Sequence, residues 1–143
     1  MKVEIMPAEP MHIIGLIERT QFSEVHGARE ALRTHILMSE DSWVAKLDGQ
    51  VVVCWGVIPP SILSSMAYVW VVASNDIGKH PHVKFLFIRY SQRILEIMLQ
   101  KYESLYGFCF PHESESIKWL RHLGAKFEDP HGGKILFRIR RSK

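Results

Sequence analysis

Two histidines near the middle of the chain are the residues whose types most directly suggest metal chemistry. His80 and His82 flank a proline, and Cys109 and His112 follow later in the sequence. Imidazole and thiolate groups are ordinary ligands of zinc and related metals. The intervening proline restricts the backbone, however, and no pair of carboxylates accompanies the histidines. We therefore predict no metal site.

Other common catalytic patterns are missing from the sequence. It contains no Gly-x-Ser-x-Gly nucleophile motif and no Walker phosphate-binding loop. Hydrolase chemistry at an activated serine and nucleotide hydrolysis at a Walker loop are therefore not expected.

The C-terminal end carries much of the formal net charge of +3, in the form of Lys134, Arg138, Arg140, Arg141 and Lys143. A basic segment of this kind can attract nucleic acid or an acidic protein. It can equally be the solvated face of a strand. No sequence motif for reading nucleic acid accompanies the charge, so we do not expect nucleic-acid binding.

The composition predicts one packed domain over residues 1–143. Hydrophobic residues make up 47% of the chain and charged residues 23%, both within the range of globular domains. No apolar run reaches the ~20 residues that a membrane helix needs. The first five residues lack an apolar stretch, so we expect no signal peptide. Cys54 and Cys109 lie in apolar segments and are expected to be reduced core thiols in a cytoplasmic setting.

Hydrophobic periodicity predicts the elements of the first half of the chain. A short strand over 3–5 is followed by helices over 9–18 and 24–38, which have apolar residues at helical spacing. Strands follow at 42–47 and 51–58, joined at Asp48-Gly49, a pair typical of a type I′ hairpin turn. The segment 67–73 is almost continuously apolar and predicts a strand buried on both faces.

The second half continues the alternation of strands and helices. We predict a loop over 74–80, a long helix over 81–101, a strand over 104–110 and a helix over 113–123 that ends at Gly124. A short strand around Phe127 and a strand over 134–140 close the chain. The order β-α-α-β-β-β-α-β-α-β-β predicts an α/β fold, a central mixed, mostly antiparallel, twisted sheet with helices on both faces.

That order resembles the GNAT (Gcn5-related N-acetyltransferase) superfamily over the whole chain. Residues 116–125, Ser-Ile-Lys-Trp-Leu-Arg-His-Leu-Gly-Ala, are similar to the GNAT segment in which a helix ends in Leu-Gly and leads into the next strand. His80-Pro81, Phe85, Arg89-Tyr90-Ser91 and the segment 116–120 also resemble small phage-encoded GNAT-like proteins of the internal virion protein A type. This narrower resemblance covers about residues 80–127.

The resemblance implies a site for acetyl-CoA at the end of the 67–73 strand and in the loop that follows. GNAT enzymes hold the pyrophosphate on backbone N–H groups of a Gln/Arg-x-x-Gly-x-Gly/Ala loop at a helix N-terminus. The matching segment 75–82 has one glycine and a proline that lacks an N–H. The candidate cofactor-binding residues are Val72, Ala73, Gly78, Lys79, His80 and His82. Acetyl-CoA binding stays open.

The catalytic groups that the resemblance implies are largely replaced. Many GNAT enzymes have a tyrosine general acid where this chain has Leu120, and an asparagine where it has Glu113. Many also place a glutamate base on the strand that corresponds to 67–73, which here carries no carboxylate. On this alignment Glu113 or His112 remains as a candidate base, and Tyr106 or Tyr68 as a candidate acid. Each is equally accounted for as a polar residue at a strand end or helix cap.

These observations lead to three hypotheses. The first is a non-catalytic, phage-encoded GNAT-like protein that binds a virion or host protein, located in the host cytoplasm or the virion. The second is an active acyltransferase with a rearranged site. The third, a basic nucleic-acid accessory protein, rests on the C-terminal charge alone.

Trp119 lies among cations and is either an interface anchor or a half-buried helix residue.

Overall fold

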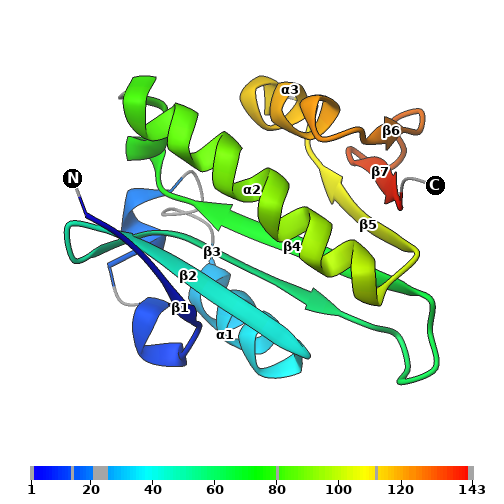
Figure 1. The fold of residues 1–143 in the computed structure, drawn as a ribbon, viewed down its shortest axis with the longest axis horizontal. Coiled ribbons are helices and arrows are strands. Elements are labelled where there is room, and N and C mark those ends of the chain that lie inside the picture. The colour runs from blue at the N-terminus through cyan, green and yellow to red at the C-terminus, as the bar shows by residue number, and fades with distance from the viewer. Residues whose placement is uncertain (1, 14, 21–25, 80, 112, 142–143) are drawn as a thin grey trace. The chain divides into compact units, whose positions relative to one another are not determined.

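The computed structural model describes residues 2–13, 15–20, 26–79, 81–111 and 113–141. The seven strands are β1 (Val3–Pro7), β2 (Asp41–Leu47), β3 (Gln50–Ile58), β4 (Met66–Ala73), β5 (Ser104–Cys109), β6 (Lys126–Phe127) and β7 (Ile135–Arg140). The helices are α1 (Ala28–Met38), α2 (Pro81–Lys101) and α3 (Ser114–His122), with short 3-10 helices η1 (Pro10–Ile13), η2 (Ile17–Arg19) and η3 (Asn75–Lys79). The strand order is β1-β2-β3-β4-β5-β7-β6 (Figure 1). The predicted α/β class, with a mixed and mostly antiparallel sheet, is confirmed.

The chain forms two compact units. The first comprises residues 1–58 and 70–85, and the second comprises residues 59–69 and 86–143. Strand β4 and helix α2 each contribute residues to both units. The expectation of a single domain over 1–143 stays a prediction.

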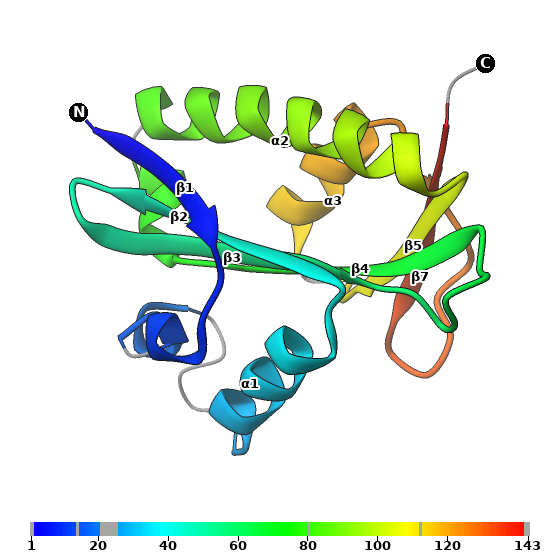
Figure 2. The same cartoon turned by 60° about the horizontal axis from the view of Figure 1, so that its bottom comes forward.

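The first unit is built around an antiparallel hairpin. Asp48 and Gly49 have φ values of 51° and 84°, which confirms the turn between β2 and β3. Strand β1 pairs antiparallel with β2, and β3 is buried along nearly its whole length. Helix α1 lies on one side of these strands (Figure 2) and buries Leu32 and Ile36. The indole N–H of Trp70, in the middle of β4, donates to the Ser39 hydroxyl at 2.8 Å.

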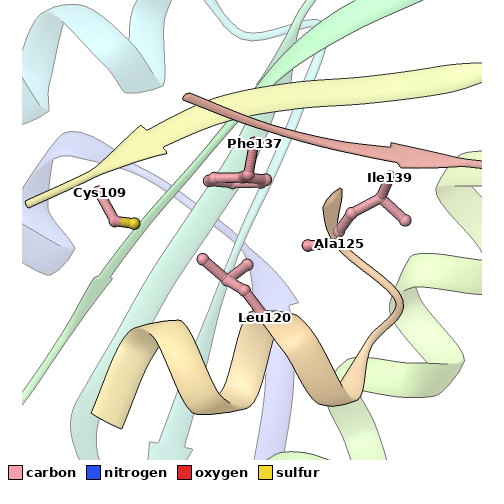
Figure 3. Close-up of a cluster of buried hydrophobic side chains, with 5 residues drawn as sticks. All are labelled: Cys109, Leu120, Ala125, Phe137 and Ile139. Atoms are coloured by element: carbon pink, nitrogen blue, oxygen red, sulfur yellow. The ribbon is translucent and has the colours of Figure 1, made fainter. Parts of the chain in front are cut away.

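The second unit places its helices against one face of its strands. The first half of β4 pairs parallel with β5, which pairs antiparallel with β7. Strand β6 forms the edge beside β7. Inward-facing residues of β5 and β7 pack with α3 in a buried cluster: Cys109, Leu120, Ala125, Phe137 and Ile139 (Figure 3). Leu95 and Leu99 of α2 pack against the same cluster.

Several predicted boundaries were wrong, and the backbone explains the main ones. The helix expected over 9–18 is two 3-10 helices, because Gly15 has a φ of 83° that a continuous helix cannot contain. The helix expected over 24–38 begins at Ala28, after Gly27 at a φ of 78°. Residues 21–25 lie outside the described part. The loop expected over 74–80 contains η3. By contrast, Gly124 has a φ of 93°, as predicted for the residue after α3.

Candidate functional site

The end of β4 holds the first two candidate cofactor residues. Val72 and Ala73 are the penultimate and last residues of the strand, and both are half-buried. The backbone N–H of Ser74 donates to the carbonyl of Val52 at 2.7 Å, which ties the strand end to β3. Ser74 itself is buried. This end of β4 is therefore a fixed point from which the next loop starts.

Helix η3 occupies the loop in which a phosphate cradle was considered. The N–H of Ile77 donates to the carbonyl of Ser74 at 3.2 Å, and the Ile77 side chain is buried. Gly78 and Lys79 complete the helix, with Lys79 exposed. A 3-10 turn closed in this way directs Ile77 N–H into its own backbone and not outward to an anion.

Helix α2 begins directly beyond this turn. Its first residue, Pro81, has no N–H to offer, and His82 follows with an exposed side chain. His80 lies outside the described residues. Two positions of this segment, Ile77 and Pro81, therefore offer no N–H to a CoA pyrophosphate. Exposed Lys79 and Lys84 remain as side-chain cations.

Glu113, the candidate base, lies at the N-terminal end of α3. It occupies the N-cap position, and its carboxylate accepts the N–H of Phe110 at 3.3 Å. Its own N–H donates to the Phe110 carbonyl at 2.9 Å, and its carbonyl accepts the N–H of Ile117 at 3.0 Å. Burial raises the pKa of the nearby Cys109 thiol, and the charge of Glu113 raises it further. Glu113 therefore stands at the N-cap position without capping α3 through its side chain, which binds the preceding backbone at Phe110 instead.

Leu120 stands where the family tyrosine would be, and it points into the core. Its side chain is 7% exposed and packs with Phe137 and Ile139 of β7 (Figure 3). A leucine cannot transfer a proton. In this chain the position contributes to packing between α3 and the sheet.

Tyr106 and Tyr68, the candidate acids, lie beside each other on neighbouring strands. They are register partners in β5 and β4, and their ring centroids are 5.8 Å apart. Burial raises the pKa of Tyr68, with a smaller contribution from Tyr106. Phe110, whose N–H binds the Glu113 carboxylate, lies four residue steps beyond Tyr106, about 13 Å along an extended chain. The structure therefore does not assemble Tyr106 and Glu113 into an acid–base pair.

Metal binding finds no support among the described residues. In the ranges that the structure covers, no group of three or more His, Cys, Asp or Glu side chains is placed to hold an ion. Cys109 is buried in the cluster of Figure 3, and His82 is exposed on α2. His80 and His112 lie outside the described residues.

Cys54, the other cysteine of the chain, is also buried, and burial raises the pKa of its thiol to about 12.

Trp119 is a packing residue of α3 and is half-buried, as one of the two alternatives expected. Its indole N–H donates to the Ser91 hydroxyl of α2 at 2.9 Å, and its ring lies 5.1 Å from that of Phe87. These contacts explain part of the Arg89-Tyr90-Ser91 motif, because Ser91 joins the two helices.

Comparison with known proteins identifies the family. A family profile described as bacteriophage T7 probable scaffold protein Gp13 matches residues 50–132, more than half of the chain. The chain belongs to the T7 Gp13 family. The match to the T7 Gp13 family extends beyond residues 80–127, on which the phage resemblance rested, and includes β3, β4, η3, α2, β5, α3 and β6. No protein with a curated functional description matches the sequence.

Solved structures establish the fold of this T7 Gp13 family member. The PaiA N-acetyltransferase of Thermoplasma acidophilum, solved with coenzyme A, is 13% identical over 99% of this chain and 100% of that one, with a TM-score of 0.69. The GNAT domain of S. lividans PAT is 9% identical over 97% and 90%, with a TM-score of 0.70. A spermidine N-acetyltransferase SpeG chimera from Vibrio cholerae and hSSAT is 11% identical over 98% and 96%, with a TM-score of 0.72. The GNAT fold is confirmed.

The sequence named Tyr68 and Tyr106 as separate candidate acids but did not show that they lie together with Phe108. Tyr68, Tyr106 and Phe108 form a row of rings on the sheet face opposite the buried cluster, beside the cations of β7. The alternation of β7 was visible in the sequence, but the pairing of Tyr68 with Tyr106 joins residues far apart along the chain. That long-range register has no local signal.

Proposed function

We propose that this protein is a non-catalytic, GNAT-fold component of phage assembly that binds another virion or host protein. Membership of the T7 Gp13 family, whose description names a scaffold protein, is the observation that carries the proposal. On this proposal the protein is made in the host cytoplasm and acts during particle assembly. Among the described residues, no helix is both long and apolar enough to cross a membrane.

The local chemistry supports a role without catalysis. In the described loop Ile77 uses its N–H within η3 and Pro81 has none, so two donors that a phosphate cradle could use are missing. Leu120 stands where the family has a tyrosine acid, and its side chain is buried in the hydrophobic core. The Glu113 carboxylate accepts the N–H of Phe110 at the junction of β5 and α3. Leu120 and Glu113 therefore have structural contacts where acetyl transfer would need catalytic groups.

Calorimetric titration tests the loss of cofactor binding. Acetyl-CoA and free CoA are titrated into the purified full chain, with a CoA-binding GNAT enzyme as positive control. We expect no binding heat and no thermal shift up to millimolar ligand. Micromolar binding would overturn the non-catalytic proposal. Lys79→Ala and His82→Ala variants would then test whether side-chain cations hold the phosphates.

Genetic complementation tests the assembly role. The phage gene is deleted and supplied from a plasmid as wild type or as the Glu113→Gln variant, which keeps an oxygen to accept the Phe110 N–H. We expect deletion to reduce the yield of infectious particles and Glu113→Gln to restore it. Wild-type yield without the gene would exclude an essential assembly role. Mass spectrometry of purified particles decides whether the protein is packaged.

An acetyl-CoA-dependent N-acetyltransferase with a rearranged site is the second candidate function. The observation that favours it is the fold, shared with acetyltransferases that include one solved with coenzyme A. In that case Glu113 is the candidate base and Tyr106 the candidate acid. Retained turnover in a Glu113→Ala protein would remove Glu113 from that role.

A further inference from the structure

The strand register of the second unit creates a sheet face with its own composition, which we call the open face. Side chains alternate along a strand, so Leu105, Gly107 and Cys109 of β5 turn inward while Tyr106 and Phe108 turn outward. On the outward side Tyr106 is paired with Tyr68 of β4 and with Arg138 of β7, and Phe108 is paired with Leu136.

Helices of the second unit cover only the inward side. Leu120 of α3 and Leu95 of α2 pack against the inward cluster, and Figure 2 shows α3 on a single side of β5 and β7. On the open face Phe108 is 38% exposed and Leu136 is 47% exposed. Large apolar side chains are therefore presented to solvent on this face.

The rings of the open face form a continuous row. The centroids of Tyr68 and Tyr106 are 5.8 Å apart, and those of Tyr68 and Phe108 are 6.2 Å apart with planes inclined at 27°. Phe110 extends the row, 6.0 Å from Phe108. Lys134 places its Nζ 4.4 Å from the Phe108 ring centroid, a cation–π contact at the margin of the row.

Positive charge surrounds this row. By strand alternation and register the open face carries four cations, Lys126, Lys134, Arg138 and Arg140, and one carboxylate, Glu128. Lys126 and Arg138 are direct register partners, and like charges placed opposite each other on adjacent strands are destabilising. Within the described ranges no carboxylate forms an ion pair with Lys126, Arg138 or Arg140. An anionic partner would relieve this repulsion.

We propose that the open face binds single-stranded nucleic acid. Bases stack on exposed aromatic rings whatever their sequence, and lysine and arginine neutralise the phosphates. The open face presents an exposed Phe108 and half-buried Tyr68 and Tyr106 beside such cations. A duplex keeps its bases stacked on one another, so the ring row favours a single strand. The C-terminal charge alone did not justify an expectation of nucleic-acid binding. The aromatic rings that favour a single strand come from β4 and β5, not from the C-terminal segment. The property goes beyond the proposed assembly role.

Fluorescence anisotropy with labelled oligo-dT tests the proposal directly. The full chain is titrated into an oligonucleotide about twenty nucleotides long, which exceeds the site of a single stacking platform. Phe108→Ala is expected to weaken binding about tenfold, because it removes one stacking surface. Phe108→Trp keeps a ring and is expected to bind at least as tightly as wild type. Equal affinity of Phe108→Ala and wild type would overturn the proposal.

A charge-reversal pair supplies the matched control. Arg138→Glu with Arg140→Glu reverses two cations of the open face, and Arg89→Glu with Arg93→Glu reverses two cations of α2. We expect the first pair to abolish measurable binding and the second to change it by less than about threefold, because charges beyond ~10 Å are screened at 0.1 M salt. Equal losses would mean that net charge, and not this face, determines binding.

Salt and competitor titrations complete the test. With up to four phosphate contacts, the slope of log affinity against log salt is expected to reach about −3 for a single strand. A slope near zero would overturn the proposal. A duplex of the same length, or polyglutamate, that binds as tightly as oligo-dT would overturn the single-strand assignment and indicate a different anionic partner. Circular dichroism of each variant confirms that it is folded.

Discussion

The two faces of the strands in the second unit are made of alternate residues and differ in almost every property. The inward face carries Leu105, Cys109 and Phe137, which are all buried. The open face carries Phe108, Leu136 and Arg138, which are all exposed. The inward face is constrained by packing against helices. The open face is not packed against helices of its own unit.

The largest expected effect comes from truncating the inward face. Leu120→Ala should lower the free energy of unfolding by about 2–5 kcal/mol, because it leaves a cavity among tightly packed side chains. Leu136→Ala removes the same atoms from the open face and should cost less than about 1 kcal/mol. Urea denaturation of both variants measures the difference. Equal losses would show that the two faces are not distinct in packing.

The next effect comes from filling space on the inward face. A Cβ added at Gly107 would lie 2.7 Å from Cζ of Phe137 and 2.8 Å from the carbonyl oxygen of Val69. Gly107→Ala should therefore cost about 1–3 kcal/mol, as overpacking does in other cores. Adding Phe137→Leu should remove the ring clash but not the contact with backbone, so rescue should be at most partial. Thermal denaturation that shows no loss for Gly107→Ala would contradict the close packing described.

A smaller effect on stability is expected from the open face. Phe108→Ala should lower the free energy of unfolding by about 1 kcal/mol, less than Leu120→Ala, because Phe108 is 38% exposed whereas Leu120 is 7% exposed. The same substitution is expected to weaken oligo-dT binding about tenfold. A stability loss as large as that of Leu120→Ala would indicate that Phe108 is a core residue. The inward and open faces would then not differ in packing. Parallel urea and anisotropy measurements decide the matter.

The smallest effect is a dependence of stability on pH. The pKa of Cys109 is raised in the folded chain, by burial and then by Glu113, above an ordinary value of 9.0. The folded protein therefore holds the thiol proton more tightly than the unfolded chain. Its stabilising contribution is complete below pH 9.0 and is lost as pH rises through the folded pKa. Cys109→Ala should show a shallower decline above pH 9.0 in urea titrations, and an identical decline would contradict this assignment.

Local signals in the sequence were sufficient for much of the fold. Asp48-Gly49 predicted the hairpin because both residues must adopt positive φ, and Gly124 predicted the end of α3 for the same reason. The apolar period of 81–101 predicted α2. The break at Gly15 and the 3-10 turn over 75–79 were not predicted, because a glycine or a short polar run is compatible with several backbone conformations.

The candidate site depended more on context than on residue type. Glu113 could be proposed as a base from the sequence, but its hydrogen bond from Phe110 N–H is a property of the folded β5–α3 junction. Leu120 was known to lack a proton donor. The packing of its side chain against Phe137 and Ile139 depends on the position of α3 on the sheet, which the sequence does not give.

The sequence by itself determined the order of elements, the turns that need glycine, and the absence of a tyrosine at position 120. These depend on residue type and on neighbours a few positions away. Tertiary structure alone decided which alternate residues of β5 and β7 are covered, and it brought Tyr68 beside Tyr106. Strand pairing joins distant segments, and a shift of one residue would exchange the two faces. The aromatic and basic open face is therefore a product of register.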